Sequence, residues 1–257
     1  MSFLTGNARA LVAAVAFLTR LPVGRLVVLD GGDVARAALF FPLVGASLGA
    51  MSGAVAQSLT PALSPLLAAC VAVGCVAIAT GALHLDAIAD TADALGGRTR
   101  EHSLEIMRDH AIGAYGAVAL ILDLAVRVAA LAVLAGRHQA VLAALVAGAL
   151  SRASAPAAGS LLPYARPGAG TGAPMMRVSR ARAAGAVAIA AAAAVAVAPV
   201  DGAILLAAAA GLTAAAVAGW RHWLGGVTGD VLGAGIEGTE LLCLVVAVAL
   251  TRTGGLA

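Results

Sequence analysis

The sequence predicts an all-α, polytopic membrane protein with six or seven transmembrane helices and an N-terminal interfacial helix. Hydrophobic residues make up 61% of the 257-residue chain and charged residues only 11%, whereas an ordinary soluble domain carries about 25% charged residues. No water-soluble shape could bury this much apolar surface, so the lipid bilayer is the expected solvent. The apolar residues also form runs long enough for helices to cross a bilayer.

These apolar runs predict the individual helices. Seven candidate spans lie at residues 37–60, 62–83, 111–134, 139–162, 183–199, 203–220 and 237–251. The fifth and seventh runs are short for the roughly 20 residues that a span needs, so six and seven spans are equally favoured. The segment Asn7–Leu21 is too short to cross, and Arg9 and Arg20 flank it, so we expect it to lie in the membrane interface. We expect a single integral membrane domain, residues 1–257, because no repeat and no separate soluble domain is apparent.

The arginines predict the orientation. All 16 cationic residues are arginine, and with these spans twelve of them fall on the side of the N-terminus, two on the opposite side and two within spans. The positive-inside rule then places the N-terminus and the three longest loops in the cytoplasm. This distribution favours an enzyme at the cytoplasmic surface over a transporter, which needs polar groups near the midplane and access from both sides. The net charge of +3 reflects orientation, and we expect no nucleic-acid partner.

The stretch HLDAIADTADALGG, residues 84–97, concentrates three of the chain's 13 acidic residues. On a helix Asp86, Asp90 and Asp93 share a face about 60° wide. A solvated acidic helix end is the simpler interpretation, but like charges one turn apart repel, and nothing in the segment offsets this repulsion. Oxygen-rich sites suit Mg²⁺ or Mn²⁺. Because the outer pair is roughly 10 Å apart along the axis, we expect either two ions, or one ion with two aspartates and ligands from another loop.

Two glycine-rich segments offer further ligands. Residues 225–240, GGVTGDVLGAGIEGTE, predict a glycine-rich turn that contains Asp230, Glu237 and Glu240 as possible ligands. Its glycines let a phosphate approach the backbone closely, and Thr228 offers a hydroxyl. Residues 163–172, PYARPGAGTG, form the second segment.

Arginines near these segments suit a phosphorylated substrate. Tyr164 and Arg166 belong to the second glycine-rich segment, and Arg108 opens the third span. Arginines beside metal-binding carboxylates share the charge of a phosphate with the metal. Each single arginine is explained about equally well as an anchor under the positive-inside rule.

Charged residues inside the predicted spans need partners. Asp123 and Arg127 are spaced i, i+4 in the third span, and we expect mutual neutralisation. Arg152, in the fourth span, has no partner on its own helix. Two partners remain open for it: Asp123, or a substrate phosphate reached by snorkelling, which we favour. The histidines show no zinc-ligand spacing, and the three cysteines lie in apolar runs as small hydrophobic residues.

Several blocks of the chain carry a family resemblance. GALHLDAIADTADALGG followed by LEIMRDHAIGAYG resembles the signature of cobalamin synthases, the adenosylcobinamide-GDP ribazoletransferases of the bacterial inner membrane. FLTRLPV at 17–23, SR at 151–152, PYARPGAGTG and GGVTGDVLGAGIE resemble further family blocks in the same order, so the resemblance covers essentially the whole chain. Ala82, Ala87 and Ala94 stand where glycine would be expected, and they should make the acidic segment more helical.

The resemblance implies a reaction and its site residues. A ribose hydroxyl of α-ribazole, or of its 5′-phosphate, would attack adenosylcobinamide-GDP, release GMP and give adenosylcobalamin or its 5′-phosphate. Asp86, Asp90 and Asp93 would hold Mg²⁺, or Mn²⁺, on the pyrophosphate, and Asp230 or Glu237 would complete the site or accept the attacking proton. Phosphate contacts would come from Arg20, Arg108, Arg152 and Arg166.

Two alternatives remain beside this interpretation. The nearer is another Mg²⁺-dependent, aspartate-rich membrane phosphotransferase or prenyltransferase, which would also place spaced aspartates at a cytoplasmic helix end. The second is a transporter or a structural membrane protein, which the clustered motifs and the asymmetry of the arginines disfavour. The oligomeric state is open.

Overall fold

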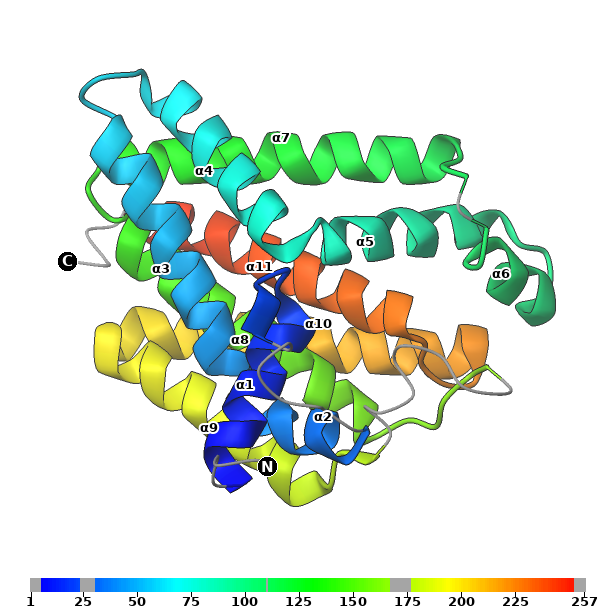
Figure 1. Ribbon diagram of the computed structural model, residues 1–257. Helices are drawn as coiled ribbons and strands as arrows, with labels where there is room; N and C mark the ends of the chain where they lie inside the picture. The colour runs from blue at the N-terminus through cyan, green and yellow to red at the C-terminus, as the bar shows by residue number, and fades with distance from the viewer. Residues whose placement is uncertain (1–5, 24–30, 110, 167–176, 252–257) are drawn as a thin grey trace.

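The computed structural model describes residues 6–23, 31–109, 111–166 and 177–251. Within these ranges the chain forms eleven α-helices and no strand apart from one isolated bridge between Tyr164 and Val227. The helices are α1 (Gly6–Leu18), α2 (Gly31–Ala37), α3 (Phe41–Leu59), α4 (Pro65–Thr80), α5 (Leu83–Asp93), α6 (Arg100–Ile106), α7 (Ala114–Gly136), α8 (Ala140–Gly159), α9 (Arg180–Val197), α10 (Pro199–Leu224) and α11 (Gly229–Thr251). The all-α prediction is confirmed (Figure 1).

Six helices of the described chain are long and apolar enough to cross a membrane. They are α7 to α11 and the continuous segment Gly32–Leu59, which contains α3. A seventh span results if α4 and the acidic helix α5, which meet at 90°, are taken together. The predicted six or seven spans are therefore confirmed. The N-terminal helix α1 has 13 residues and is too short to cross a bilayer, as expected.

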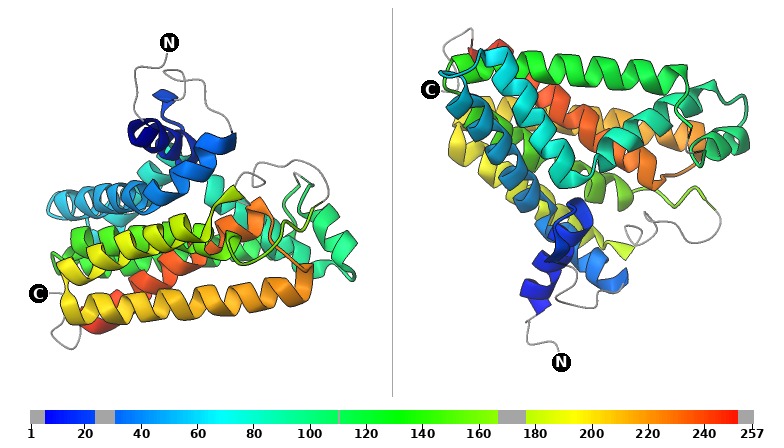
Figure 2. Two further views of the ribbon diagram at one scale, coloured as in Figure 1. Left: turned by 90° about the horizontal axis from the view of Figure 1, so that it is seen from below. Right: turned by 45° about the horizontal axis from the view of Figure 1, so that its top comes forward.

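The connections lie at two ends of the helix bundle. Figures 1 and 2 show the α3–α4, α7–α8 and α9–α10 connections at one end, together with the C-terminal end of α11. At the other end lie α6, the segment that follows α8, and the turn between α10 and α11. The acidic block, the start of the glycine-rich segment 225–240 and residues 163–166 of the second glycine-rich segment thus lie at one end of the bundle, and residues 167–172 of that second segment lie outside the described residues.

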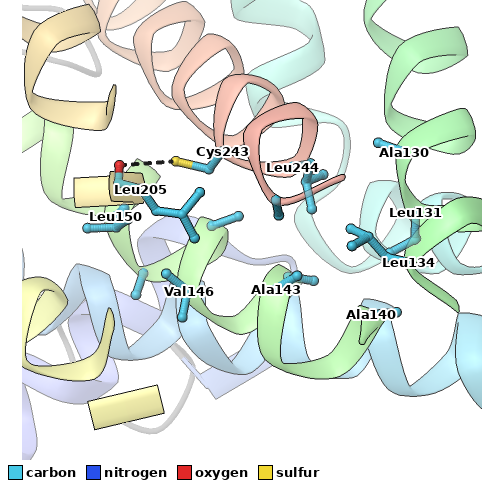
Figure 3. Packing of buried hydrophobic residues seen from close by; sticks show 14 of the residues in the cluster. Ala130, Leu131, Leu134, Ala140, Ala143, Val146, Leu150, Leu205, Cys243 and Leu244 are labelled. Atoms are coloured by element: carbon cyan, nitrogen blue, oxygen red, sulfur yellow. Dashed lines mark hydrogen bonds between the residues drawn. The ribbon is translucent and has the colours of Figure 1, made fainter. Parts of the chain in front are cut away.

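Small residues hold the closest helix pair together. The helices α3 and α8 pack through Gly45, Gly49 and Gly53 on α3, and a Cβ on Gly49 would lie only 1.9 Å from the carbonyl oxygen of Ala144. Small side chains let membrane helices approach to backbone contact. Around this pair α7, α10 and α11 add a core of alanine, valine and leucine, in which Cys243 is buried against Leu205 (Figure 3).

A sharp bend separates α4 from α5. Gly81 (φ 64°) and Ala82 (φ 56°) both have left-handed backbone conformations, and they turn the chain by 90°. The expectation that Ala82 makes this segment more helical is therefore wrong, because Ala82 lies at the break itself. The turn is fixed by Arg20, whose backbone N–H donates to the carbonyl of Ala79 at 2.7 Å and whose side chain lies against Gly81. The bend directs α5 between α7 and α11 (Figure 1).

The glycine-rich segment 225–240 is not the predicted turn. Its helix α11 begins at Gly229 and continues to Thr251, so the last span is longer than the predicted 237–251. The glycines here permit close packing rather than loop freedom. A Cβ on Gly233 would lie 2.5 Å from the Cβ of Ala87 on α5, and one on Gly235 would lie 2.8 Å from the Trp220 ring on α10.

Candidate functional site

A cavity of about 630 Å³ opens at the end of the bundle that carries the predicted motifs. Its lining comes from α1, α3, α5, α8 and α11 and from the segments after α6 and α8. The polar side chains that line it are His84, Asp86, Asp90, Arg108, Arg166 and Asp230. A volume of this size is in the range that encloses most of a drug-sized ligand.

The helix α5 brings two aspartates into this cavity. Asp86 and Asp90 lie one turn apart, and both line the cavity, Asp86 exposed and Asp90 half-buried. The carboxylate of Asp90 is repelled by those of Asp86 and Asp230 and attracted by the guanidinium of Arg166. Charged residues from three separate segments thus lie close enough to act on the Asp90 carboxylate.

Asp93 has a different role from the other two aspartates. Its carboxylate accepts hydrogen bonds from the backbone N–H groups of Gly113 (2.7 Å) and Gly116 (2.8 Å) at the N-terminus of α7, where a negative charge is stabilised. It does not line the cavity. Within the described ranges no group of three His, Cys, Asp or Glu side chains could hold a metal ion. Two of the three aspartates thus share the cavity, and the third joins α5 to α7. Which of them hold a metal ion stays a prediction.

Asp230 is held opposite Arg166 by the pairing of two loop segments. The backbone of Ala165 donates to Val227 at 2.8 Å, and Val227 donates to Pro163 at 2.9 Å. This pairing places Arg166 Nη2 2.6 Å from Asp230 Oδ2.

Thr228 caps this arrangement. Its hydroxyl donates to Asp230 Oδ2 at 3.2 Å and accepts from the backbone N–H of Val231 at 3.3 Å, at the start of α11. It is fully buried and does not line the cavity, so it orients Asp230. The hydroxyl of Tyr164 is buried without a hydrogen-bond partner among the described residues, and Tyr164 does not line the cavity either.

The two remaining arginines near this end differ in position. Arg108 is exposed and lines the cavity. Arg20 does not line it, because its side chain packs on Gly81 at the bend between α4 and α5. Arg20 therefore supports the turn that orients α5, and the prediction that it contacts substrate phosphate has no support in its position.

Glu237 and Arg152 lie in a second, buried cluster. Arg127 contacts Asp123 (3.3 Å), Glu240 (2.8 Å) and Glu237, and Glu240 also pairs with Arg152. The predicted pair of Asp123 and Arg127 is confirmed. The structure pairs Arg152 with Glu240 instead of Asp123, and neither Arg152 nor Glu237 lines the cavity. The phosphate contact of Arg152 and the role of Glu237 at the reacting groups stay predictions. We name these five residues the intramembrane charge cluster.

Sequence reasoning missed several residues of these sites. It grouped Glu240 with the glycine-rich turn 225–240 as a possible ligand, and so it did not identify Glu240 on α11 as the partner of Arg152 on α8. His84, which the sequence did not single out because the histidines show no zinc-ligand spacing, lies in the first turn of α5 and lines the same cavity. Phe17 and Phe41 also line the cavity. The one available signal for Phe17 was its place at the start of the family block FLTRLPV.

Comparisons with known proteins agree with these motifs. The chain matches the model of the family described as cobalamin-5-phosphate synthase over residues 10–248. It is 43% identical to the adenosylcobinamide-GDP ribazoletransferase of Bradyrhizobium diazoefficiens, with 92% of each chain covered. Identity is 39% to the enzyme of that name from Syntrophobacter fumaroxidans, over 92% of this chain and 97% of the relative. Identity is 36% to the enzyme of the same name from Escherichia coli O7:K1, over 91% of this chain and 96% of the relative.

No solved structure matches the chain. The family match nevertheless spans nearly all the described helices, and it includes the acidic block, the bend before it and both glycine-rich segments. The relatives match over nine-tenths of their own length. The chain therefore belongs to the cobalamin-5-phosphate synthase family.

Proposed function

We propose that this chain transfers the adenosylcobinamide phosphate of adenosylcobinamide-GDP to α-ribazole or its 5′-phosphate. GMP is released, and the nucleotide loop of adenosylcobalamin or its 5′-phosphate is closed. Relatives that match over most of the chain are named for this transfer. The structural observation that supports it best is the charged part of the cavity, where Asp86, Asp90 and Asp230 lie with Arg108 and Arg166. Family membership also removes the basis for a prenyltransferase or a transporter.

The chemistry is phosphoryl transfer to an alcohol. A ribose hydroxyl forms a bond to the cobinamide-side phosphorus, the bond from that phosphorus to the bridging oxygen breaks, and GMP leaves with that oxygen. Such reactions depend mostly on positioning and on charge neutralisation. Arg108 and Arg166 are the cavity cations that would hold phosphate oxygens. Asp230, oriented by Thr228 and Arg166, is the candidate acceptor of the hydroxyl proton.

The donor set of the cavity fits a divalent cation. Among the described residues neither Asp86 nor Asp90 forms an ion pair with an arginine, and the two carboxylates repel each other. Mg²⁺ commonly binds through one or two carboxylates together with substrate phosphates. We propose that Asp86 and Asp90 hold Mg²⁺, or Mn²⁺, with the pyrophosphate. The ion would neutralise charge that develops on the phosphate oxygens.

The cavity is proposed to face the cytoplasm of a bacterial inner membrane. At its end of the bundle lie α6 and the segment that follows α8. Arg98, Arg100 and Arg108 lie in or beside α6, and Arg166 follows α8. The positive-inside rule places such an end in the cytoplasm. Both nucleotide substrates would then reach the site from the compartment in which nucleotides are made.

Release of GMP tests the proposal directly. The purified protein, in detergent, is incubated with adenosylcobinamide-GDP and α-ribazole, with and without Mg²⁺, and both GMP and the corrinoid product are measured. We expect GMP and the coupled product in equal amounts, and loss of both when α-ribazole is omitted. GMP formed without α-ribazole would indicate hydrolysis and overturn the transfer. Repeating the assay with α-ribazole 5′-phosphate compares the two acceptors.

Two variants and a control link this activity to the site. Asp90→Asn removes one carboxylate charge from the cavity, and Glu105→Gln makes the same change on the exposed surface of α6. Only the first should lose transfer. Equal activity of both would place the reaction elsewhere in the molecule.

A further inference from the structure

The cavity has an apolar part that the phosphoryl transfer does not use. Its charged part comes mainly from α5 and α11, while Ala16, Phe17 and Leu18 from α1 and Phe41 from α3 form what we name the apolar wall. Figure 2 shows α1 beside the beginning of α3, on one side of the helix bundle. The short N-terminal helix is thus a component of the site rather than only a membrane anchor.

Two aromatic rings are stacked in this wall. The ring centroids of Phe17 and Phe41 are 5.6 Å apart, and the ring planes are inclined by 14°. Phe41 is only 1% exposed, while Phe17 is partly exposed, and both line the cavity. Phe41 therefore supports the ring of Phe17, whose accessible part offers a flat apolar surface to a ligand. The whole chain has only eight Phe, Tyr and Trp residues, and two of them form this stacked pair at the cavity.

The wall is fixed in place by the residues that follow it. Leu18 is fully buried, and the hydroxyl of Thr19 donates to the carbonyl of Val15 at 2.7 Å, which closes the end of α1. The next backbone N–H, that of Arg20, donates to Ala79 on α4. Phe17 is thereby tied to the same bend that orients Asp86 and Asp90. The distance between the apolar wall and the charged part of the cavity is therefore fixed.

The chemistry of the wall selects among the rings that a nucleotide substrate could present. Its side chains offer no hydrogen-bond donor or acceptor. A guanine ring would lose hydrogen bonds to water from its carbonyl, amide and amino groups there, at a cost of about 1–3 kcal/mol for each unpaired group. The base of α-ribazole is a benzimidazole ring with two methyl groups. It carries no such exocyclic polar groups, and its binding is favoured by stacking and by burial of the methyl groups.

We infer that the apolar wall formed by Phe17 and Phe41 is the subsite for the dimethylbenzimidazole base of α-ribazole. The inference rests on the proposed function, because it takes the acceptor nucleoside from it. With the base on Phe17, the ribose reaches the charged part of the cavity, where a hydroxyl is presented to Asp230 and to the phosphorus. The subsite makes Phe17 a specificity-determining residue for the acceptor.

Direct binding tests the subsite without turnover. Equilibrium dialysis measures the Kd of α-ribazole with the full-length protein in detergent, with no corrinoid present. Phe17→Ala should raise this Kd by about tenfold, the lower part of the range for one base–aromatic stack, and Phe17→Tyr should restore most of the affinity. Phe40→Leu is the matched control, because Phe40 neighbours Phe41 in sequence and does not line the cavity. It should leave the Kd unchanged.

A series of nucleosides tests the chemistry of the subsite. The wild type should bind α-ribazole more tightly than the nucleoside of unmethylated benzimidazole, and guanosine should not compete. In Phe17→Ala the preference for the methylated base should shrink. Guanosine competing as well as α-ribazole, or a Phe17→Ala protein with an unchanged Kd, would overturn the subsite. Added phospholipid is a further test. If it displaces α-ribazole from the wild type but not from Phe17→Ala, Phe17 contacts lipid, and the subsite is overturned as well.

Kinetics separate this inference from the proposed function. Phe17→Ala should raise the KM for α-ribazole while the KM for adenosylcobinamide-GDP stays within about twofold of the wild type. If the wild type releases GMP and Phe17→Ala raises only the KM for adenosylcobinamide-GDP, the transfer stands and the subsite is wrong. If the wild type binds α-ribazole through Phe17 and forms no coupled product, the subsite stands and the proposed transfer is wrong. Thermal unfolding of each variant confirms that it folds.

Discussion

Arg152 on α8 and Glu240 on α11 form an ion pair inside the helix bundle, and both side chains are nine-tenths or more buried. Glu240 also accepts from Arg127 on α7 at 2.8 Å, so one carboxylate joins three helices. Charges inside a membrane protein are costly unless they are paired. The intramembrane charge cluster therefore fixes the rotation of α11, the helix whose first turn carries Asp230.

The first prediction separates stability from activity at this pair. Arg152→Leu leaves Glu240 with one cationic partner and three carboxylates facing one guanidinium, so it should lower the free energy of unfolding by about 3 kcal/mol, as for a broken buried pair. The double variant with Glu240→Leu removes both charges and should recover most of this loss. Thermal unfolding in detergent measures both.

Kinetics on the same variants decide whether Arg152 belongs to the site. We expect the KM values of folded Arg152→Leu to remain near those of the wild type, because Arg152 does not line the site cavity. Arg180→Leu, which removes an exposed arginine at the start of α9, is the control and should change neither quantity. A stable Arg152→Leu protein with a sharply raised KM would restore the phosphate contact that the sequence favoured.

The second prediction ranks the three aspartates. Asp86→Asn and Asp90→Asn should each lower kcat by about 100-fold or more, because loss of metal charge costs several kcal/mol of barrier. Asp93→Asn should cost less in kcat. An amide has one oxygen and can accept only one of the two hydrogen bonds from Gly113 and Gly116. The main effect of Asp93→Asn should therefore be a loss of about 1–2 kcal/mol in the free energy of unfolding. Kinetics at several Mg²⁺ concentrations, run beside unfolding, test this ranking. Three equal losses of kcat with unchanged stability would return Asp93 to the metal site.

A structural feature can be predicted from this sequence when it depends on residues that are close together in the chain, and not when it depends on a contact between distant helices. Hydropathy predicts the spans, since each reflects only its own residues. The helical spacing of Asp86 and Asp90 likewise predicts their shared face. Glycine, in contrast, is ambiguous: the segment around Gly233 looks like a loop until the facing Ala87 is known. The partner of Arg152 lies on another helix, and no local pattern could identify it.

The third prediction concerns the contact between α11 and α5. Gly233→Ala would place its Cβ 2.5 Å from that of Ala87, so it should lower stability and displace Asp90, with loss of kcat. The exchange variant Gly233→Ala with Ala87→Gly restores the total volume and should recover both. Gly219→Ala on α10 is the matched control, since nothing lies within 4 Å of a Cβ there, and it should stabilise by about 0.5–1 kcal/mol. A single Gly233→Ala as stable and active as the wild type would refute the close packing.

The fourth prediction concerns the bend before α5. Ala82 has φ 56°, a conformation that costs a non-glycine residue about 1–2 kcal/mol. Ala82→Gly removes this strain and should raise the Tm by about 2 °C or more. Ala77→Gly, within the regular part of α4, should instead lower it, because glycine weakens a helix interior by about 0.5–1 kcal/mol. Equal effects of the two changes would mean that the left-handed turn at Ala82 is not formed.

The last prediction concerns orientation. Single cysteines at position 98, just before α6, and at position 222, in the last turn of α10, would both be exposed. These elements lie at the cavity end of the bundle, so both cysteines should react with a membrane-impermeant maleimide only in inverted vesicles. A cysteine at position 137, exposed at the opposite end, should react only in right-side-out vesicles. The excess of arginine at the cavity end is the physical reason. Position 170, in the second glycine-rich segment, should label with the first group, although it lies outside the described residues.

The three native cysteines are replaced by alanine beforehand, because Cys70 is exposed on α4 and would add background. Activity of the cysteine-free protein is the control for its fold. Labelling of positions 98 and 222 from opposite sides of the membrane would separate Asp90 from Asp230. The cavity, and with it the proposed transfer, would then be excluded. Labelling of both from outside would keep the cavity and reverse the orientation, so that the nucleotide substrates would have to reach it from the other compartment.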